Sequence, residues 1–103
     1  MTRIVRSAAF KRQLVDLTAG YRARASSNIA LKFVDQVDSA IRFIATKPLA
    51  CPIYTRIEHK DFRKWSLQDF PTSIFFRFES QDIIILEALY AHRMNISARL
   101  SKS

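Results

Sequence analysis

The chain has 103 residues, of which 49% are hydrophobic and 25% are charged, a composition that predicts one folded domain over residues 1–103 and excludes a disordered chain. Its one glycine, Gly20, excludes the glycine-rich loops that bind nucleotide phosphates, and its one cysteine, Cys51, excludes an internal disulfide. One thiol and two separated histidines do not make a metal site, so we expect no metal and no other cofactor.

The net charge of +8 lies almost entirely in the first part of the chain. Residues 1–64 contain 13 lysines and arginines against 5 acidic residues, whereas residues 65–103 contain 4 of each. A field of this sign steers a protein toward polyanions, which indicates nucleic acid or an acidic protein segment as a partner. The alternative is a basic surface that serves solubility alone.

The hydrophobic segments of the chain are too short to span a membrane. No signal-peptide-like segment follows Met1, and apolar runs such as residues 83–86 have the length of a strand. We therefore expect a cytoplasmic protein with no membrane partner. In a reducing cytoplasm, the thiol of Cys51, flanked by Ala50 and Pro52, is predicted to be packed and inert.

A short strand and a helix are predicted at the start of the chain. Residues 3–6 place two apolar side chains between arginines, as in a strand. Ser7 is a candidate N-cap for the helix that follows, and Gly20 is expected to loosen or end this helix near its last turn. Its apolar stripe consists of Phe10, Leu14, Leu17 and Tyr21.

A second helix is predicted to begin at Ser26 or Ser27 and to stop at Pro48. Only a few residues separate the two helices, so we expect them to form an antiparallel hairpin. The apolar face of the second helix is defined by Ala30, Phe33, Val34, Val37, Ile41 and Ile44.

The second half of the chain has the apolar period of strands. Residues 47–60, with two prolines and a charged cluster, are predicted to be irregular. Strands are predicted at 62–67, 74–79 and 83–90, with a turn at 69–71. The last strand is apolar on both faces and therefore central. The order β-α-α-β-β-β predicts an α+β fold in which an N-terminal helical hairpin packs on a small, mainly antiparallel sheet.

Six short motifs follow one another along residues 48–93: Pro48, Phe62-Arg63, Phe70-Pro71, Phe76-Arg77, Ile84-Ile85-Leu86 and Tyr90-Ala91-His92-Arg93. Their order and spacing resemble the ParE branch of the RelE/ParE toxin superfamily, whose members are often called plasmid stabilisation proteins. The chain departs from the family pattern in having Phe76 where Tyr is usual, Tyr90 where His is usual, and Met94-Asn95 after the final arginine.

The resemblance implies the toxin component of a type II toxin–antitoxin module, a growth inhibitor neutralised by a cognate antitoxin. ParE-like members of the superfamily act on DNA gyrase without being nucleases, whereas RelE-like members cut mRNA on the ribosome. The resemblance favours gyrase as the target of this chain. A RelE-like endoribonuclease is the alternative, and a module that retains only antitoxin binding is a third possibility.

The nuclease alternative has a defined set of candidate residues. RNA cleavage without a metal needs a base, an acid and cations that stabilise charge on the phosphate. Tyr90 and His92 lie two residues apart in a strand and could share a face, and a histidine can exchange a proton at neutral pH. The candidate cations are Arg77 and Arg93, together with Arg63 and Lys64. Glu58 and His59 lie in a charged loop, where a solvated histidine is commoner than a catalytic one.

The favoured interpretation is a binding surface without a catalytic centre. Arg77 is either part of this surface or an ordinary strand arginine paired with Glu79 or Glu87, and Trp65 is either core or a partner-facing anchor. The candidates for binding the target or the antitoxin are Arg22, Arg24, Arg63, Lys64, Arg77, Tyr90 and Arg93.

Overall fold

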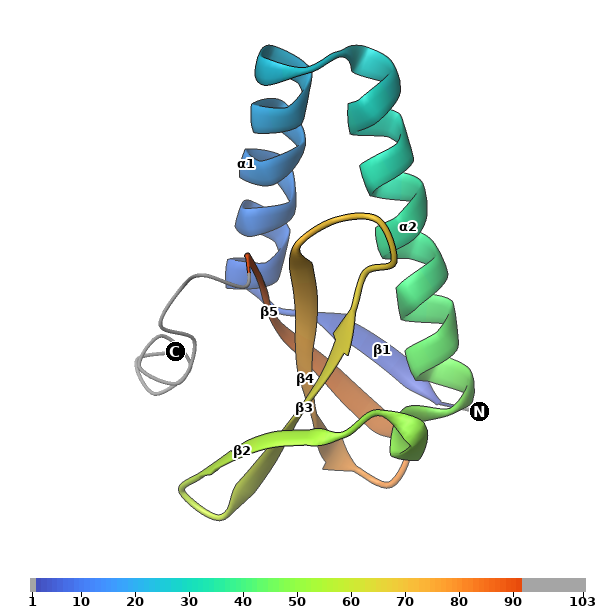
Figure 1. The fold of residues 1–103 in the computed structure, drawn as a ribbon. Helices are drawn as coiled ribbons and strands as arrows, with labels where there is room; N and C mark the ends of the chain where they lie inside the picture. The colour runs from blue at the N-terminus through green and yellow to red at the C-terminus, as the bar shows by residue number, and fades with distance from the viewer. Residues whose placement is uncertain (1, 92–103) are drawn as a thin grey trace.

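The computed structural model describes residues 2–91 and has two layers, a helical hairpin and a five-stranded sheet (Figure 1). Both helices lie on the same face of the sheet, which confirms the predicted α+β fold. In chain order the elements are β1 (Arg3–Arg6), α1 (Ala8–Arg24), α2 (Ser27–Thr46), the short 3-10 helix η1 (Pro48–Ala50), β2 (Ile53–Ile57), β3 (Lys60–Ser66), β4 (Thr72–Ser80) and β5 (Ile83–Ala91).

Serine caps fix the starts of both helices, as predicted. The backbone N–H of Phe10 donates to Ser7 Oγ at 3.0 Å, and that of Ile29 donates to Ser26 Oγ at 3.1 Å. Gly20 does not end α1, which continues for one more turn to Arg24. A single glycine weakens a helix without breaking it, and here the following residues still pack against α2.

The strands follow the order β1-β5-β4-β3-β2. β1 runs parallel to β5, and every other neighbouring pair is antiparallel. The prediction that the last strand is internal is confirmed, because β5 lies between β1 and β4. The apolar side chains on its two faces belong to two separate clusters of the core.

The prediction that residues 47–60 are irregular is wrong, because they contain η1 and the edge strand β2. The two prolines, Pro48 and Pro52, led to the wrong prediction because proline is rare inside strands. Pro52 in fact lies just before β2, and its carbonyl oxygen accepts a hydrogen bond from Lys64 N at 3.1 Å. β2 lies at an edge with exposed side chains, so it lacks the apolar pattern of an internal strand. Pairing with β2 also starts β3 at Lys60, two residues earlier than predicted.

The connection between β3 and β4 packs into the helix-facing core. Phe70 of this connection packs its ring against Tyr21 at 5.0 Å and against Phe33 at 5.2 Å, between centroids. Gln36 of α2 holds the same connection by two hydrogen bonds to Asp69, one to the carboxylate at 2.6 Å and one from its backbone N–H at 3.0 Å. The predicted turn at 69–71 is therefore a structural link between the sheet and both helices.

The hairpin between β2 and β3 turns at Glu58 and His59, whose φ angles are 51° and 67°. Two successive positive φ values define a turn that favours Asn-Gly, since other residues pay a steric cost in this region. Replacing the pair by Glu58→Asn and His59→Gly should raise the free energy of unfolding by about 1 kcal/mol, measured by urea unfolding. His59→Ala is the control, and it should give no gain because alanine meets the same steric cost. A less stable Asn-Gly variant would contradict this assignment.

Candidate functional site

We call the sheet face opposite the helices the open face. It carries a second, smaller apolar cluster. Side chains alternate along β4, so Ile74 and Phe76 belong to the helix-facing core whereas Phe75 belongs to the open face. Within residues 2–91 no helix covers this face (Figure 1). Its buried members are Phe62, Phe75, Ala88 and Tyr90, with Ile57 packed against them.

Arg77 lies on the open face between two carboxylates. Its Nη1 is 2.5 Å from Glu79 Oε2, and its Nε is 3.5 Å from Glu87 Oε1. The hydrogen bond from Arg77, helped by its charge, lowers the pKa of Glu79 below its ordinary value. One guanidinium and two ionised carboxylates have a net charge of about −1 together, so this group does not present a free cation to a phosphate.

Tyr90 is mostly core, with 7% of its surface exposed. Its ring packs against Phe75 at 6.2 Å between centroids. Burial of this kind favours a structural contribution from the aromatic ring. Of the nuclease candidates, the structure therefore brings Arg77 and Tyr90 onto one face, while His92 and Arg93 lie outside the described residues.

Lys64 and Tyr54 form the accessible side of the open face. The ammonium of Lys64 lies 5.2 Å from the ring centroid of Tyr54, and that ring meets Phe75 edge-on at 5.2 Å. Lys64 was predicted as a binding residue, whereas Tyr54 was missed. The β-branched and aromatic residues that make up most of 53–57 are the signal that would have indicated both β2 and this tyrosine.

Arg63 does not join Lys64, because neighbouring residues of β3 point to opposite faces. Its Nη1 donates a hydrogen bond to the carbonyl oxygen of Cys51 at 2.7 Å and so ties β3 to the turn after η1. Cys51 is buried, as predicted, and this burial raises the pKa of its thiol although the charge of Arg63 opposes the shift. A thiol with a raised pKa is protonated at neutral pH and is not a nucleophile.

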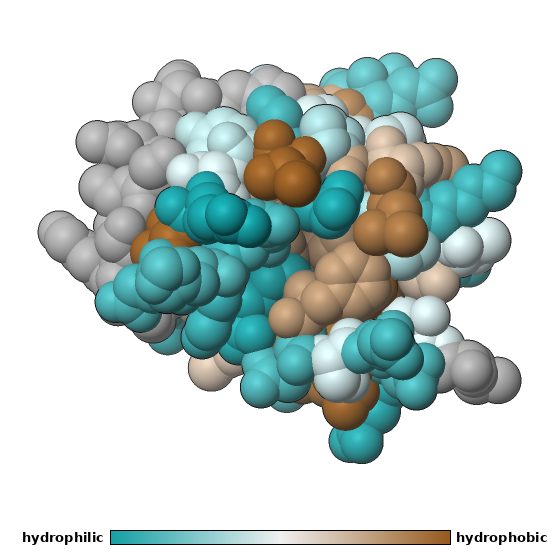
Figure 2. All heavy atoms as spheres, turned by 90° about the horizontal axis from the view of Figure 1, so that it is seen from below, coloured by the Kyte–Doolittle hydropathy of each residue, from teal (hydrophilic) through white to brown (hydrophobic). Residues whose placement is uncertain are grey.

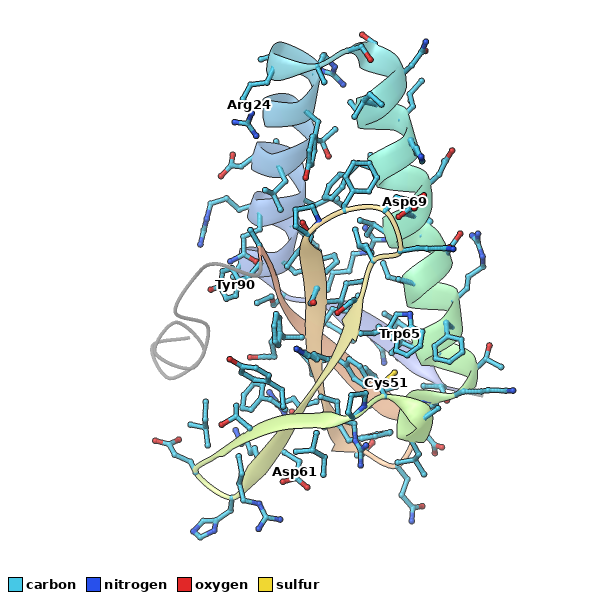
Figure 3. The ribbon with its side chains drawn as sticks, viewed as in Figure 1. Arg24, Cys51, Asp61, Trp65, Asp69 and Tyr90 are labelled. Carbon is cyan, nitrogen blue, oxygen red and sulfur yellow. The ribbon has the colours of Figure 1, made fainter. Side chains whose placement is uncertain are left out.

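Arg22 and Arg24 lie in the last turn of α1, far along the hairpin from the open face (Figure 3). Cations at this end of a helix interact favourably with its dipole, which is a structural reason for both. The predicted binding residues are therefore spread over three places within residues 2–91: the end of α1, the open face and the helix side of β3. Glu58 and His59 form the tip of the β2–β3 hairpin.

A groove between α2 and β3 was not predicted. It has a volume of about 420 Å³, and its lining includes Gln36, Ala40, Phe43 and Trp65. The rings of Phe43 and Trp65 stack at 4.2 Å between centroids with an angle of 15° between their planes. Trp65 packs against the core and also borders this groove, while its use as a partner-facing anchor stays a prediction.

The described residues offer neither a cluster of metal ligands nor a membrane-spanning helix. Residues 2–91 contain no group of three or more His, Cys, Asp or Glu side chains placed to hold a metal ion. None of the helices described is long and apolar enough to cross a membrane.

These observations define a class of protein, an α+β domain with a helical hairpin on one face of a mostly antiparallel sheet. No family model matches the chain, and no curated protein matches its sequence. Among solved structures, it is similar to a chain of the "Chromosomal ParDE TA system from P. aeruginosa", with a TM-score of 0.74 and 15% sequence identity. The match covers 88% of this chain and 96% of that chain. At this identity the likeness shows a shared fold.

Proposed function

We propose that the protein is the toxin of a type II toxin–antitoxin module, that a cognate antitoxin neutralises it, and that it inhibits growth by acting on DNA gyrase. The observation that carries the proposal is the fold shared with a chain of a ParDE toxin–antitoxin system over nearly the whole of both chains. The motif order of residues 48–93, which resembles the ParE branch, supports the same assignment.

The open face supports binding more than cleavage. A nuclease of this kind needs a cation directed at the scissile phosphate and an accessible group that transfers a proton. Arg77 is instead held between Glu79 and Glu87, and Tyr90 is buried in an apolar cluster. Among the predicted binding residues, the cations of Arg22, Arg24 and Lys64 form no ion pair within residues 2–91 and suit contacts with an acidic partner.

The RelE-like endoribonuclease is the second candidate. It is favoured by one feature of the sequence, the histidine and arginine that directly follow β5 at positions 92 and 93. His92 can act as an acid or base near neutral pH, and Arg93 carries a permanent charge.

Induction of the gene alone, and together with the neighbouring open reading frame, tests the proposal. We expect growth arrest with filamentous cells and a DNA-damage response when the gene is induced alone, and normal growth when both genes are induced. In vitro, the purified protein should inhibit supercoiling by gyrase and leave ribosome-bound mRNA intact. The absence of any growth arrest would contradict the assignment as an active toxin.

Two substitutions extend this test to the C-terminal motif. Arg93→Ala should weaken growth arrest more than His92→Ala does, because it removes a permanent charge and up to about five hydrogen-bond donors. Ribosome-dependent cuts in mRNA that disappear with His92→Ala, with a loss of about 10²-fold or more in rate, would instead establish the endoribonuclease.

A further inference from the structure

Exposed apolar side chains gather where α2, η1 and the β2–β3 hairpin meet. Leu49 of η1 is 73% exposed and Ile53 of β2 is 51% exposed, and the rings of Phe43 and Trp65 stack between the end of α2 and β3. We call Phe43, Leu49, Ile53 and Trp65 the apolar strip. Figure 2 looks at the end of the molecule that carries η1 and the hairpin, and shows several separate hydrophobic patches exposed there among hydrophilic residues.

The sheet register places two members of the strip, Ile53 and Trp65, on one face of the sheet. Ile53 pairs with Arg63 on β3, and Trp65 lies two residues further along the same strand and therefore on the same face. Trp65 in turn contacts Phe43 near the end of α2, from which Lys47 leads into η1 and Leu49. The groove between α2 and β3 continues the strip toward Gln36.

The charges around the strip are basic. Arg42 and Lys47 form no ion pair within residues 2–91. Two carboxylates on neighbouring segments are paired: Asp61 of β3 with Arg56 at 2.8 Å, and Asp69, which Gln36 of the groove binds, with Lys32 at 3.4 Å. The pKa of Asp69 is lowered by its hydrogen bond with Gln36 and by Lys32. An occupant of the strip therefore meets apolar surface and uncompensated positive charge.

This combination selects one kind of occupant. A second copy of a chain with a net charge of +8 would bring like charges together. Residues 92–103 would do the same, because they contain two arginines and one lysine and no acidic residue. A single-stranded nucleic acid would need accessible rings for stacking with its bases. The most exposed side chains of the strip, Leu49 and Ile53, are instead aliphatic, and the rings of Phe43 and Trp65 stack on each other. An acidic protein segment with apolar anchors complements both the shape and the charge.

We propose that the apolar strip is a docking site for an acidic segment of the antitoxin, which inserts an aliphatic or aromatic side chain beside Trp65. This inference rests on the proposed function, and it adds where on the toxin the antitoxin is held and which chemistry holds it. Apolar anchors supply the contact area, and carboxylates of the segment meet Arg42 and Lys47.

Glutamate substitutions at exposed apolar positions test the strip against matched controls. The probe is the protein encoded by the neighbouring open reading frame, and the measurement is its dissociation constant for the refolded full-length chain. Leu49→Glu and Ile53→Glu should each weaken binding about tenfold or more, because a carboxylate replaces an anchor contact and opposes the acidic segment. Val15→Glu and Leu31→Glu alter equally exposed side chains of α1 and α2 and should change binding less than about twofold.

A second measurement uses Trp65, the only tryptophan of the chain. Labelled with 5-fluorotryptophan, the protein should show a shifted ¹⁹F resonance when the complex forms. A complex that forms with an unchanged resonance, or an equal loss of binding in the strip and control variants, would overturn the docking site and leave the toxin assignment standing. If the wild-type chain forms no complex at all, both proposals are overturned together.

Discussion

Replacing Phe33 by alanine should lower the free energy of unfolding by about 3–5 kcal/mol, the usual cost of truncating a buried phenylalanine. Phe33 has no exposed surface, and its ring packs against Tyr21 at 5.0 Å and Phe70 at 5.2 Å between centroids. The substitution therefore leaves a cavity where α1, α2 and the β3–β4 connection meet. Since domains of this size have about 5–15 kcal/mol of stability in total, the substitution should remove a large share of it and lower the urea midpoint markedly.

Leu31→Ala is the matched control in the same helix. Leu31 is 62% exposed, so its truncation should change the free energy of unfolding by less than about 0.5 kcal/mol. Both variants are measured by urea unfolding at pH 7, with the tryptophan emission of Trp65 as the probe. Equal losses for the two variants would mean that the aromatic cluster does not hold the two layers together.

The elements that the sequence predicted correctly depend on local patterns. A period of 3.6 residues indicated both helices, and serine caps located their starts, because these signals act within a few residues of the chain. β5 was predicted as internal because its side chains are apolar on both faces. Register between distant strands leaves no comparable local signal.

The candidate site was predicted less well because it depends on that register. Arg77 meets Glu87 across the β4–β5 pair, where a bulge at Phe75 and Phe76 shifts the pairing by one residue. Arg63 turns toward the carbonyl oxygen of Cys51, which no spacing in the sequence indicates. β2 was missed because an exposed edge strand needs no apolar pattern, and with it Tyr54 and the apolar strip were missed.

Arg77→Met should destabilise the protein by about 1–3 kcal/mol, because it leaves the carboxylates of Glu79 and Glu87 facing each other without their shared cation. The side chain of Glu87 is only 14% exposed, so water solvates it poorly. The double variant Arg77→Met with Glu87→Leu should recover most of this loss, since it removes the unpaired charge as well. Urea unfolding of both variants and of the wild type measures the difference.

Growth arrest by the same variants separates a structural from a functional arginine. We expect the double variant to regain toxicity along with stability, because the ion pairs of Arg77 within the open face already account for its charge. Lys64→Met is the control, since it removes a cation from the same face and leaves no buried carboxylate unpaired. This substitution should lower the free energy of unfolding by less than about 1 kcal/mol. If the double variant is as stable as the wild type but no longer arrests growth, then Arg77 contacts the target directly. The open face would in that case be the surface that acts on the target, and the carboxylates would be partners that the target displaces.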